Sequence, residues 1–453
     1  MFVKRLILIL LKKVHSASTL ILSKFTLYFL GALFFSWNIH ADSWSWSGAY
    51  IIQPETLEYA GPFQIQVKDG LVEKISSSPV SKEPLYILPG FCDSHVTLGA
   101  NSLGGWKERG ELEADLKQFL LHGFTNLQSI ADPPWASELS EIRKKNSQYP
   151  RLFVLPPVLL AGSKELPTSK VSGYKILKSP EEAISSLTGK KGKIHLFLRH
   201  NKEEAFEVDG KLLYRMRSEA EKNGLELSVS TFGEEFANWE ALSSETKVLF
   251  HPIPETSSIR PVAHNLVKQI WAPLLGIYFT RKEIGTPTFA EEWEKWTDWS
   301  PTFKERALSK DVLSTFPSLS ESEKQEADKE YESYLAFLRA RKNLSLRILL
   351  GSGAGHQLQF PGISGWKELR ILSDLLGPKE ALRAATETTC QYLGASHEGK
   401  IRVGKPAHLL IFREDPIQNW DKLKTLRTVV TERVKTEISS PEKKKTKSGK
   451  KEK

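Results

Sequence analysis

The sequence predicts an α/β fold in which a parallel sheet or barrel of alternating strands and helices is inserted into a small β-domain. Three observations predict it. The 453 residues are enough for about three domains or for one large barrel with additions. Strand patterns occur near both ends of the chain, and between them apolar β-type runs alternate with charged, helix-like stretches.

The first 41 residues have the pattern of an export signal. Basic residues precede an uncharged apolar run at 25–37 (FTLYFLGALFFSW), and the stretch Ile39-His40-Ala41 resembles a signal-peptidase site. A membrane-spanning helix needs about 20 apolar residues, so the run is short for a permanent anchor, although the long basic region leaves an uncleaved signal anchor open. The pattern predicts export to the periplasm, with contact to the membrane only through an uncleaved signal.

Strand patterns at both ends of the remaining chain predict a composite β-domain. Near the start, alternating or β-rich runs occur at 47–53, 63–67 and 71–76, and Lys68-Asp69-Gly70 joins the last two as a hairpin. Near the end, 405–412 (KPAHLLIF) and 424–431 also look like strands. We therefore expect residues 42–88 and 400–435 to form one small β-domain.

The region between them, 89–399, carries the βα pattern. Six apolar runs each follow a helix-like stretch, and they are 124–130 (FTNLQSI), 151–160 (RLFVLPPVLL), 193–199 (KIHLFLR), 225–232 (LELSVSTF), 247–253 (KVLFHPI) and 344–351 (LSLRILLG).

One segment, 281–345, breaks this rhythm. It holds Trp293, Trp296 and Trp299, many charged residues and a predicted helix from about Ser320 to Lys342, but no convincing strand. We interpret it as a helical insertion. It is either a lid over a substrate site or a surface hairpin whose tryptophans are packed core.

The distribution of charge argues against a nucleic-acid partner. The chain has 63 Lys and Arg against 54 Asp and Glu, a net charge of +9. The excess sits in the first 41 residues and in the Lys-rich end, so the body is nearly neutral and offers no broad phosphate-binding face. Residues 436–453 have almost no apolar positions and are predicted to be a disordered tail.

The two cysteines, Cys92 and Cys390, are the only thiols. An oxidising compartment would let them pair, but their distance along the chain says nothing about their distance in space. The sequence therefore does not predict a disulfide.

Two motifs resemble the amidohydrolase superfamily of metal-dependent hydrolases, close to its imidazolonepropionase and prolidase-type members. Residues 88–98 (LPGFCDSHVTL) are similar to the family's first barrel strand, which ends in His-x-His. Residues 399–412 (GKIRVGKPAHLLIF) are similar to its closing motif, with His408 where the family has Asp. The resemblance covers nearly all of residues 45–435. It implies a (β/α)8 TIM-type barrel over 89–399, flanked by a small β-sandwich built from both chain ends.

The resemblance also implies where a catalytic metal ion, usually zinc, would be held, and several of those positions have changed. His95 matches the first histidine of the first strand, but Thr97 stands at the second. Ser230 stands at the fifth-strand histidine, and Gly353 stands at the eighth-strand Asp that binds metal and takes the proton from water. The residues that remain as candidate zinc ligands are His95, His251 on the sixth strand and His195 on the fourth, where Lys193 is the alternative counterpart.

A rearranged site would need a base, and the sequence offers Asp93 and Glu234 without selecting between them. His356, in the loop after the eighth strand, is a further ligand candidate that we expect to be exposed. Zinc needs about three protein ligands and a nearby base for hydrolysis, so a standard site is not expected and zinc binding should be weak or absent.

Two hypotheses about function follow. In the first, the protein is an exported, catalytically impaired hydrolase of C–N bonds in amides or cyclic amides. In the second, it is a pseudoenzyme whose barrel binds a small amide-like ligand or a partner without turnover. The resemblance further implies a homodimer.

Overall fold

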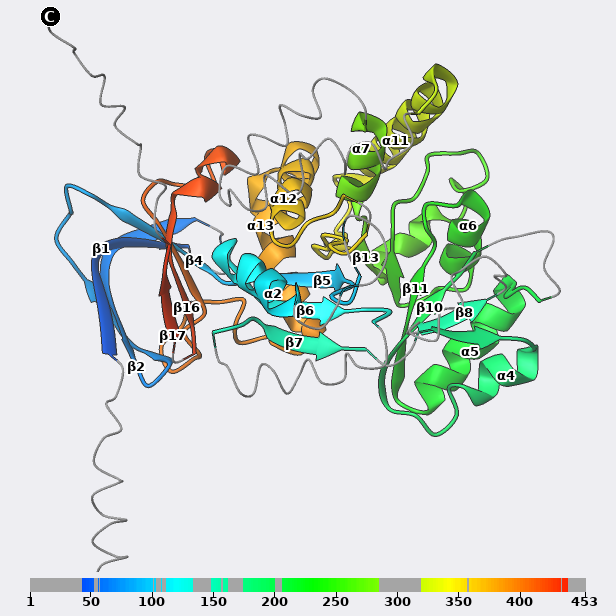
Figure 1. Ribbon diagram of the computed structural model, residues 1–453, viewed down its shortest axis with the longest axis horizontal. Helices are drawn as coiled ribbons and strands as arrows, with labels where there is room; N and C mark the ends of the chain where they lie inside the picture. Colours follow the sequence, from blue (N-terminus) through cyan, green and yellow to red (C-terminus); the bar gives the residue numbers. More distant parts are fainter. Residues whose placement is uncertain are drawn as a thin grey trace, which may run out of the picture. The chain divides into compact units, whose positions relative to one another are not determined.

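The computed structural model describes a chain in which strands from both ends form one domain around a βα region (Figure 1). The residues that it describes are 43–52, 56, 58–100, 102, 107, 111–132, 148–155, 158–161, 174–199, 206–284, 319–356, 358–432 and 434–438. The predicted signal at 1–41, the three tryptophans of the predicted insertion and the chain from 439 onward lie outside these residues. No helix in the described part of the chain is long and apolar enough to cross a membrane.

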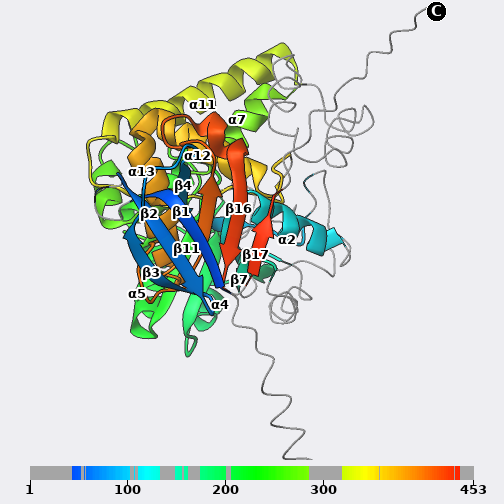
Figure 2. The ribbon, with the colours of Figure 1, turned by 90° about the vertical axis from the view of Figure 1, so that its left-hand side faces the viewer.

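A seven-stranded mixed sheet joins the two ends of the chain (Figure 2). Its centre is β4, which pairs in parallel with β1 and antiparallel with β15. In the order β17-β16-β15-β4-β1-β2-β3, its strands are Val434–Glu437, Leu426–Thr431, Leu409–Phe412, Leu85–Pro89, Ser43–Ile52, Tyr59–Lys68 and Leu71–Ser77. The last of the seven in chain order, β17, extends to Glu437 and so reaches two residues into the segment expected to be a disordered tail.

The sheet curls so that β3, at one edge, reaches the segment that precedes β15. Val72 of β3 donates its backbone N–H to Lys405 O at 2.9 Å, and Ala407 donates to Gly70 O at 2.8 Å, just before β15 begins. The apolar side chains that face inward form a core of their own, which includes Ile65, Val72 and Ile411. Where the sequence predicts a β-sandwich, the structure therefore has one continuous sheet folded over its own core.

The βα region contains two sets of parallel strands. Seven strands pair in the order β14-β13-β12-β11-β10-β8-β9, all in parallel, with bounds Arg347–Ile348, Ile270–Ala272, Val248–Phe250, Leu225–Ser230, Gly192–Phe197, Val158–Ala161 and Tyr174–Leu177. Three more pair in the order β5-β6-β7, with bounds Phe91–Val96, Phe124–Ser129 and Arg151–Val154. Each of the six apolar runs of the sequence contains one or two of these strands.

Backbone hydrogen bonds connect the two sets of strands. Ser94 of β5 donates its N–H to Leu350 O, and Gly353 donates to His95 O, each at 2.9 Å, so β5 lies beside the segment that follows β14. At the other side, β7 and β8 follow each other along the chain, and β7 pairs with β6 while β8 pairs with β10. This arrangement brings the ends of β5, β10, β12 and β14 together.

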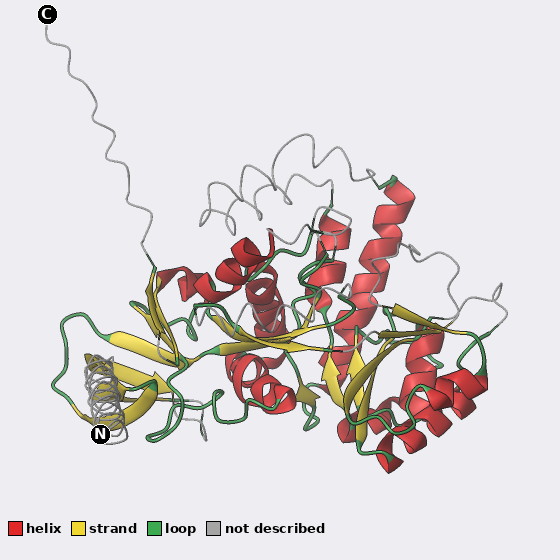
Figure 3. Cartoon of the chain, turned by 60° about the horizontal axis from the view of Figure 1, so that its bottom comes forward, coloured by secondary structure: helices red, strands yellow, loops and turns green. Residues whose placement is uncertain are grey.

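Helices pack beside the strands (Figure 3). Helix α5 contacts β11 and its neighbours α4 and α6, whereas α12 packs against α7 and α13. The helices are α2 (Leu112–Leu121), α4 (Pro180–Ser185), α5 (Gly210–Lys222), α6 (Glu235–Ser243), α7 (Leu275–Glu283), α11 (Glu321–Arg341), α12 (Ile363–Leu376), α13 (Pro378–Arg383) and α14 (Thr389–Leu393), with short turns η3 (Ala263–Lys268), η4 (Ala384–Thr388) and η5 (Trp420–Thr425).

Side-chain caps set where several helices begin. Asp209 accepts a hydrogen bond from Leu212 N at the start of α5, and Ser179 accepts one from Glu182 N at the start of α4. At α11, Ser320 and Glu323 form a reciprocal capping box. The helix that the sequence predicts from about Ser320 to Lys342 is therefore present, and the rest of the predicted insertion, 285–318, lies outside the described residues.

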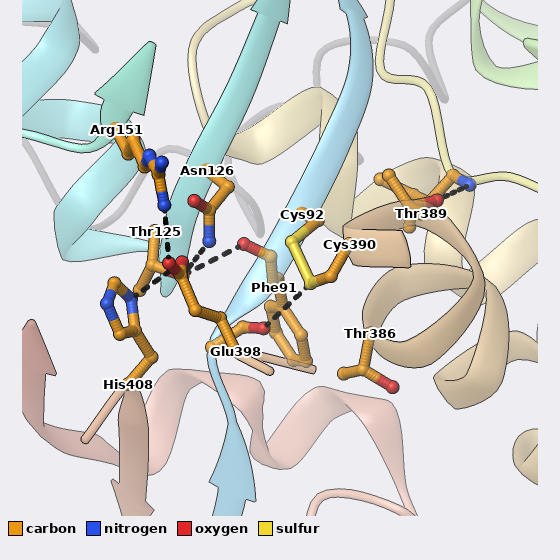
Figure 4. The surroundings of a disulfide bond; sticks show 12 residues. Phe91, Cys92, Thr125, Asn126, Arg151, Thr386, Thr389, Cys390, Glu398 and His408 are labelled. Carbon is orange, nitrogen blue, oxygen red and sulfur yellow. Dashed lines mark hydrogen bonds and ion pairs between the residues drawn. A yellow bond between two sulfur atoms is a disulfide. The ribbon is translucent and has the colours of Figure 1, made fainter. Parts of the chain in front are cut away.

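A disulfide joins Cys92 of β5 to Cys390 of α14 (Figure 4). Their Cα atoms are 5.4 Å apart although 298 residues separate them in the sequence. This bond could not be expected from the amino-acid pattern, because no local motif shows that the last helix of the βα region packs on the first strand.

Beside the disulfide, a buried charged group joins the βα region to the seven-stranded sheet. Glu398 lies between Arg151, with an Nη1–Oε1 distance of 2.9 Å, and His408, with an Nδ1–Oε2 distance of 3.5 Å (Figure 4). His408 is 2% exposed and occupies the position at which the closing motif of the family has Asp. The motif position therefore keeps a buried polar side chain. Histidine can carry a positive charge, whereas the Asp of the family motif carries a negative one.

Candidate functional site

Four histidines gather inside the βα region, near the carboxyl ends of its strands. They come from four places in the chain: His95 is on β5, His195 is on β10, His251 follows β12, and His356 follows β14. The centroid of the His95 ring lies 5.6 Å from that of His251, 5.7 Å from that of His356 and 6.2 Å from that of His195. We call these four residues the histidine cluster.

The structure thus brings together the three histidines that the sequence offers as ligands, and it adds a fourth. His356 is half-buried, and its Nε2 atom is fully covered, so the expectation that this residue is exposed is wrong. The reason is local: Gly355 has φ +100°, and an added Cβ would lie 2.1 Å from Thr97 O, so the loop runs tightly against β5. The glycine-rich sequence turns the histidine inward.

His195 is already occupied by hydrogen bonds. Its Nδ1 lies 2.7 Å from Ser228 Oγ and its Nε2 lies 2.9 Å from Ser230 Oγ, both on the neighbouring strand β11. Lys193, the alternative fourth-strand residue, lies near the start of β10, where it pairs with Glu226 at 3.1 Å and lies over the Tyr392 ring. Lys193 is therefore not part of the histidine cluster.

Phenylalanine rings fill the space around the imidazoles. The Phe250 ring centroid lies 5.1 Å from that of His95 and 5.3 Å from that of His195. Phe197 packs edge-on against His195 at 5.3 Å, and Phe232 lies 4.7 Å from His251. The interior at this level is consequently an aromatic core that contains histidines.

The three family ligand positions that have lost their ligands have other structural roles. Thr97 donates its hydroxyl to Ile130 O at 2.9 Å, and Ser230 bonds to His195. Gly353 has φ +66°, and an added Cβ would lie 2.5 Å from Ile277 Cδ1. At Gly353 the backbone conformation and the packing both oppose a larger residue.

Several imidazole nitrogens in the cluster lack hydrogen-bond partners among the described residues. They are both ring nitrogens of His95 and the Nε2 atoms of His251 and His356, while His251 Nδ1 lies 3.2 Å from the Tyr278 hydroxyl. Burial lowers the pKa of His95 and of His251 well below 6.5, and the neighbouring histidines lower both further. Burial also lowers the pKa of His356 to about 4 and that of His195 to about 3, so the cluster is neutral at pH 7.

The two candidate bases have different surroundings. Asp93 is fully buried, and its Oδ1 accepts hydrogen bonds from the backbone N–H groups of His95 and Ser352, so it ties β5 to the segment after β14. Burial raises its pKa to about 7. Glu234 begins α6 and lies 3.9 Å from Arg199 Nε, whose guanidinium group stacks on Phe232. Asp93 thus bonds to the cluster through the backbone N–H of His95.

The cluster offers imidazole nitrogens as its metal donors. No group of three or more His, Cys, Asp or Glu in the described part of the chain is placed to hold a metal ion. One of the imidazoles, that of His195, is hydrogen-bonded to two serines, and Phe250 contacts two of the rings.

Sequence reasoning missed two features of this site. The first is the set of phenylalanines, because Phe250 and His251 are consecutive and a regular strand would turn them to opposite faces. His251 has φ +78°, which turns its ring so that both residues contact His95. The second is Arg199, a cation at the end of β10, which a positional comparison with the family's ligands does not single out.

Comparison with known proteins relates most of the chain to one group of solved structures. An ochratoxinase of A. niger is 13% identical, with a TM-score of 0.63, and the match covers 88% of this chain and 96% of that chain. A Xaa-Pro dipeptidase with bound methionine in its active site is 16% identical, with a TM-score of 0.62, and the match covers 87% of this chain and 100% of that chain. A bottromycin amidohydrolase is 18% identical, with a TM-score of 0.62, and the match covers 87% of each chain.

No protein-family model matches the sequence, and no curated protein matches it. The structural similarity spans both the seven-stranded sheet and the βα region. It agrees with the resemblance carried by residues 88–98 and 399–412. The chain therefore has the fold of the amidohydrolase superfamily.

Proposed function

We propose that this chain is an exported protein with an amidohydrolase fold that binds a small amide-like ligand and hydrolyses C–N bonds poorly or not at all. The observation that carries the proposal is the position of Phe250, whose ring contacts those of both His95 and His195. An apolar ring packs against two of the imidazoles that the resemblance implies as metal ligands.

Loss of the proton acceptor supports the same conclusion. Metal-dependent hydrolysis needs a base that takes a proton from the attacking water. The family's base position is Gly353, which has no side chain to accept a proton, and the buried Asp93 is engaged with two backbone N–H groups. Glu234 is directed toward Arg199.

One observation favours the alternative, a hydrolase with a rearranged metal site. The unpartnered nitrogens of His95, His251 and His356 are neutral imidazole donors, which suit zinc, copper or nickel. A buried polar atom without a partner costs about 1–3 kcal/mol, and a bound metal ion would remove that cost. A site of this kind requires Phe250 to move.

We also infer that the strands close a (β/α)8 barrel. The hydrogen bonds from Ser94 N to Leu350 O and from Gly353 N to His95 O support closure on one side. On the other side, closure is supported by the pairing of β7 with β6 and of β8 with β10.

Export is supported by the disulfide as well as by the N-terminal pattern. Structural disulfides persist in oxidising compartments such as the periplasm and are rare in the reducing cytosol. The bond between Cys92 and Cys390 is fully buried and closes most of the chain into a loop. A protein with such a bond is expected to be made for an oxidising compartment.

Metal content tests the proposed function. Residues 42–453, expressed without a histidine tag and purified without chelator, are expected to contain far less than one zinc, manganese or iron per chain, as measured by elemental mass spectrometry. Supplying zinc in excess should leave no zinc bound after gel filtration. About one metal ion per chain that is lost in His95→Gln and His251→Gln would instead establish the rearranged hydrolase.

A gain-of-binding variant provides the matched control. Thr97→His, Ser230→His and Gly353→Asp restore the ligands that the resemblance implies, and Phe250→Ala removes the ring that contacts His95 and His195. Asp is among the residues that adopt a positive φ most readily, and the end of the Ile277 side chain must move to admit its Cβ. The fourfold variant is expected to gain zinc affinity by several kcal/mol in calorimetry, more than the three ligand changes alone. Equal zinc binding by both variants would show that Phe250 does not block the site.

A further inference from the structure

A cavity lies at the amino end of β14, the end opposite to the one that His356 follows. Its volume is about 380 Å³. Residues of β14 and of the connection from α11 line it, together with residues of α12, α13 and η4. None of these residues belongs to the histidine cluster, so the cavity is a separate place in the molecule.

Basic side chains that water can reach line this cavity. Lys342 and Arg347 are exposed, and the side chain of Arg383 is 42% exposed. Neither Lys342 nor Arg347 has a carboxylate partner among the described residues, although Arg347 donates one N–H to the Lys268 carbonyl oxygen at 3.3 Å. Glu380 is the acidic residue of the lining, with its Oε1 atom 3.2 Å from Arg383 Nη1. Three basic residues less one acidic residue leave the lining with a net charge of +2.

Aliphatic side chains form another part of the lining. Leu344 is 44% exposed although it is apolar, so a ligand can cover it. Leu346 and Leu376 are half-buried, and they pack against the main core of the chain. Apolar surface beside a few polar groups is typical of small-molecule sites, where the polar groups fix the orientation of the ligand. The lining therefore suits a molecule that has both an anionic and an apolar part.

Hydroxyl groups and an unusual helical turn complete the lining. The turn η4 (Ala384–Thr388) is π-helical, and its first and last residues both line the cavity. Turns of this kind are rare and frequently occur at functional sites. The hydroxyl groups of Ser345 and Thr388 can donate hydrogen bonds to an anion. The cavity thus offers neutral donors as well as cations.

These observations together select the chemistry of the ligand. Guanidinium groups bind phosphate oxygens through paired, charge-assisted hydrogen bonds. A phosphate monoester carries a charge of about −2 at pH 8, which matches the net charge of the lining, whereas a carboxylate would leave half of it unbalanced. We propose that the cavity at the amino end of β14 binds a soluble phosphate monoester of a short alkyl group, with its phosphate on the three basic side chains and its alkyl group against Leu344 and Leu376.

The ion pair of Glu380 with Arg383 does not prevent this. It joins residues three apart on one helix, both partly exposed, and pairs of this kind contribute little to stability. Arg383 can therefore turn toward a phosphate at small cost. Glu380 repels a bound phosphate, so its removal should strengthen binding. The proposal goes beyond the proposed function and does not depend on it.

Calorimetry with simple probes tests the proposal. The full chain, titrated with n-butyl phosphate at pH 8, is expected to bind about one molecule per chain with a dissociation constant below about 1 mM. Inorganic phosphate lacks the alkyl group and n-butanol lacks the charge, so each should bind at least about fivefold more weakly. Added salt should weaken the binding of n-butyl phosphate.

Variants locate the site. Arg347→Gln and Arg383→Gln are each expected to weaken n-butyl phosphate binding at least about fivefold, whereas Glu380→Gln should strengthen it severalfold. Leu344→Ser should bring the affinity for n-butyl phosphate close to that for inorganic phosphate. Arg339→Gln, an exposed arginine of α11 outside the lining, is the matched control and should bind as the parent does. The replaced side chains are all at least partly exposed, and thermal melting checks that each variant is folded.

The proposal is overturned by any of three results. These are no saturable binding of n-butyl phosphate, equal binding of n-butanol or of inorganic phosphate, and unchanged binding in both arginine variants. If n-butyl phosphate does not bind, but phosphatidate vesicles retain the parent and not Arg347→Gln, the phosphate belongs to a membrane lipid and the proposal is wrong. Metal content is expected to be the same in all these variants, so failure here leaves the proposed function standing and failure there leaves this cavity standing.

Discussion

Replacing Cys92 and Cys390 by alanine is expected to lower the free energy of unfolding by about 2–5 kcal/mol. The disulfide closes a loop of 298 residues, and a bond across a long loop removes much of the conformational freedom of the unfolded chain. Both side chains are fully buried, so the loss of two sulfur atoms also leaves a small gap between β5 and α14. Urea unfolding followed by circular dichroism measures the change.

The controls separate the bond from the side chains. Parent chain unfolded in urea with a strong reductant should resemble the double variant, because its crosslink is also gone. Alkylation before reduction should label neither thiol of the folded parent. If the double variant unfolds at the same urea concentration as the oxidised parent, the bond contributes nothing to stability.

Acidification is expected to unfold the protein before about pH 4, because its buried histidines must take up protons. A buried neutral histidine contributes stability that is fully present above pH about 6.5, its ordinary pKa when unfolded, and is lost as the pH falls toward its lower folded pKa. Five histidines have their pKa lowered by burial, and they are His95, His122, His195, His251 and His356. Each histidine that stays neutral in the folded state lowers the free energy of unfolding by about 1.4 kcal/mol for every pH unit by which the pH falls through this window.

Three buried carboxyl groups oppose this effect. Burial raises the pKa of Asp93 to about 7, that of Asp132 to about 6 and that of Glu368 to about 8. Above pH about 4 these groups keep their protons in the folded state, whereas the unfolded chain releases them. The free energy of unfolding that they contribute therefore increases as the pH falls to about 4. Between pH 6 and 4.5 unfolding therefore takes up about two protons net. The free energy of unfolding falls by about 2.7 kcal/mol per pH unit over this range, and this slope becomes steeper below it.

Urea unfolding of the metal-free chain at a series of pH values between 7.5 and 4.5 measures this dependence. His195→Gln keeps a polar partner for Ser228 and Ser230 but cannot titrate, so it should reduce the slope by about 1.4 kcal/mol per pH unit. His264→Gln changes an exposed histidine and serves as the surface control. A slope that is the same in all three proteins would show that His195 does not take up a proton on unfolding.

Much of the architecture could be predicted from the sequence, because a strand shows as a short run of apolar or alternating residues. The runs 193–199 and 225–232 contain β10 and β11, and the motif of 399–412 contains β15. Strand β13 was missed because Ile270–Ala272 is only three residues long and has no alternation to detect. The pairing of β3 with the segment before β15 depends on how far the sheet curls, which no local pattern encodes.

The candidate site was predicted less completely. The positions of His95, Thr97 and Gly353 follow from their places in motifs, and the replacement of ligands is visible in the letters themselves. The inward turn of His356 and the contact of Phe250 with two histidines depend on single backbone angles at Gly355 and His251. A change of one φ from negative to positive redirects a side chain without changing the hydrophobic pattern.

The seven-stranded sheet has a consequence for the order in which the chain folds. Its central strand β4 pairs with β1 from the beginning of the chain and with β15 from the end. A polypeptide that is synthesised or crosses a membrane from its N-terminus cannot complete this sheet until Glu437 has emerged, and contacts so distant in sequence form slowly. Until then the apolar face of β1 to β4 has no cover, so the nascent chain is most prone to aggregation, and most in need of a chaperone, in the interval before its last strands arrive.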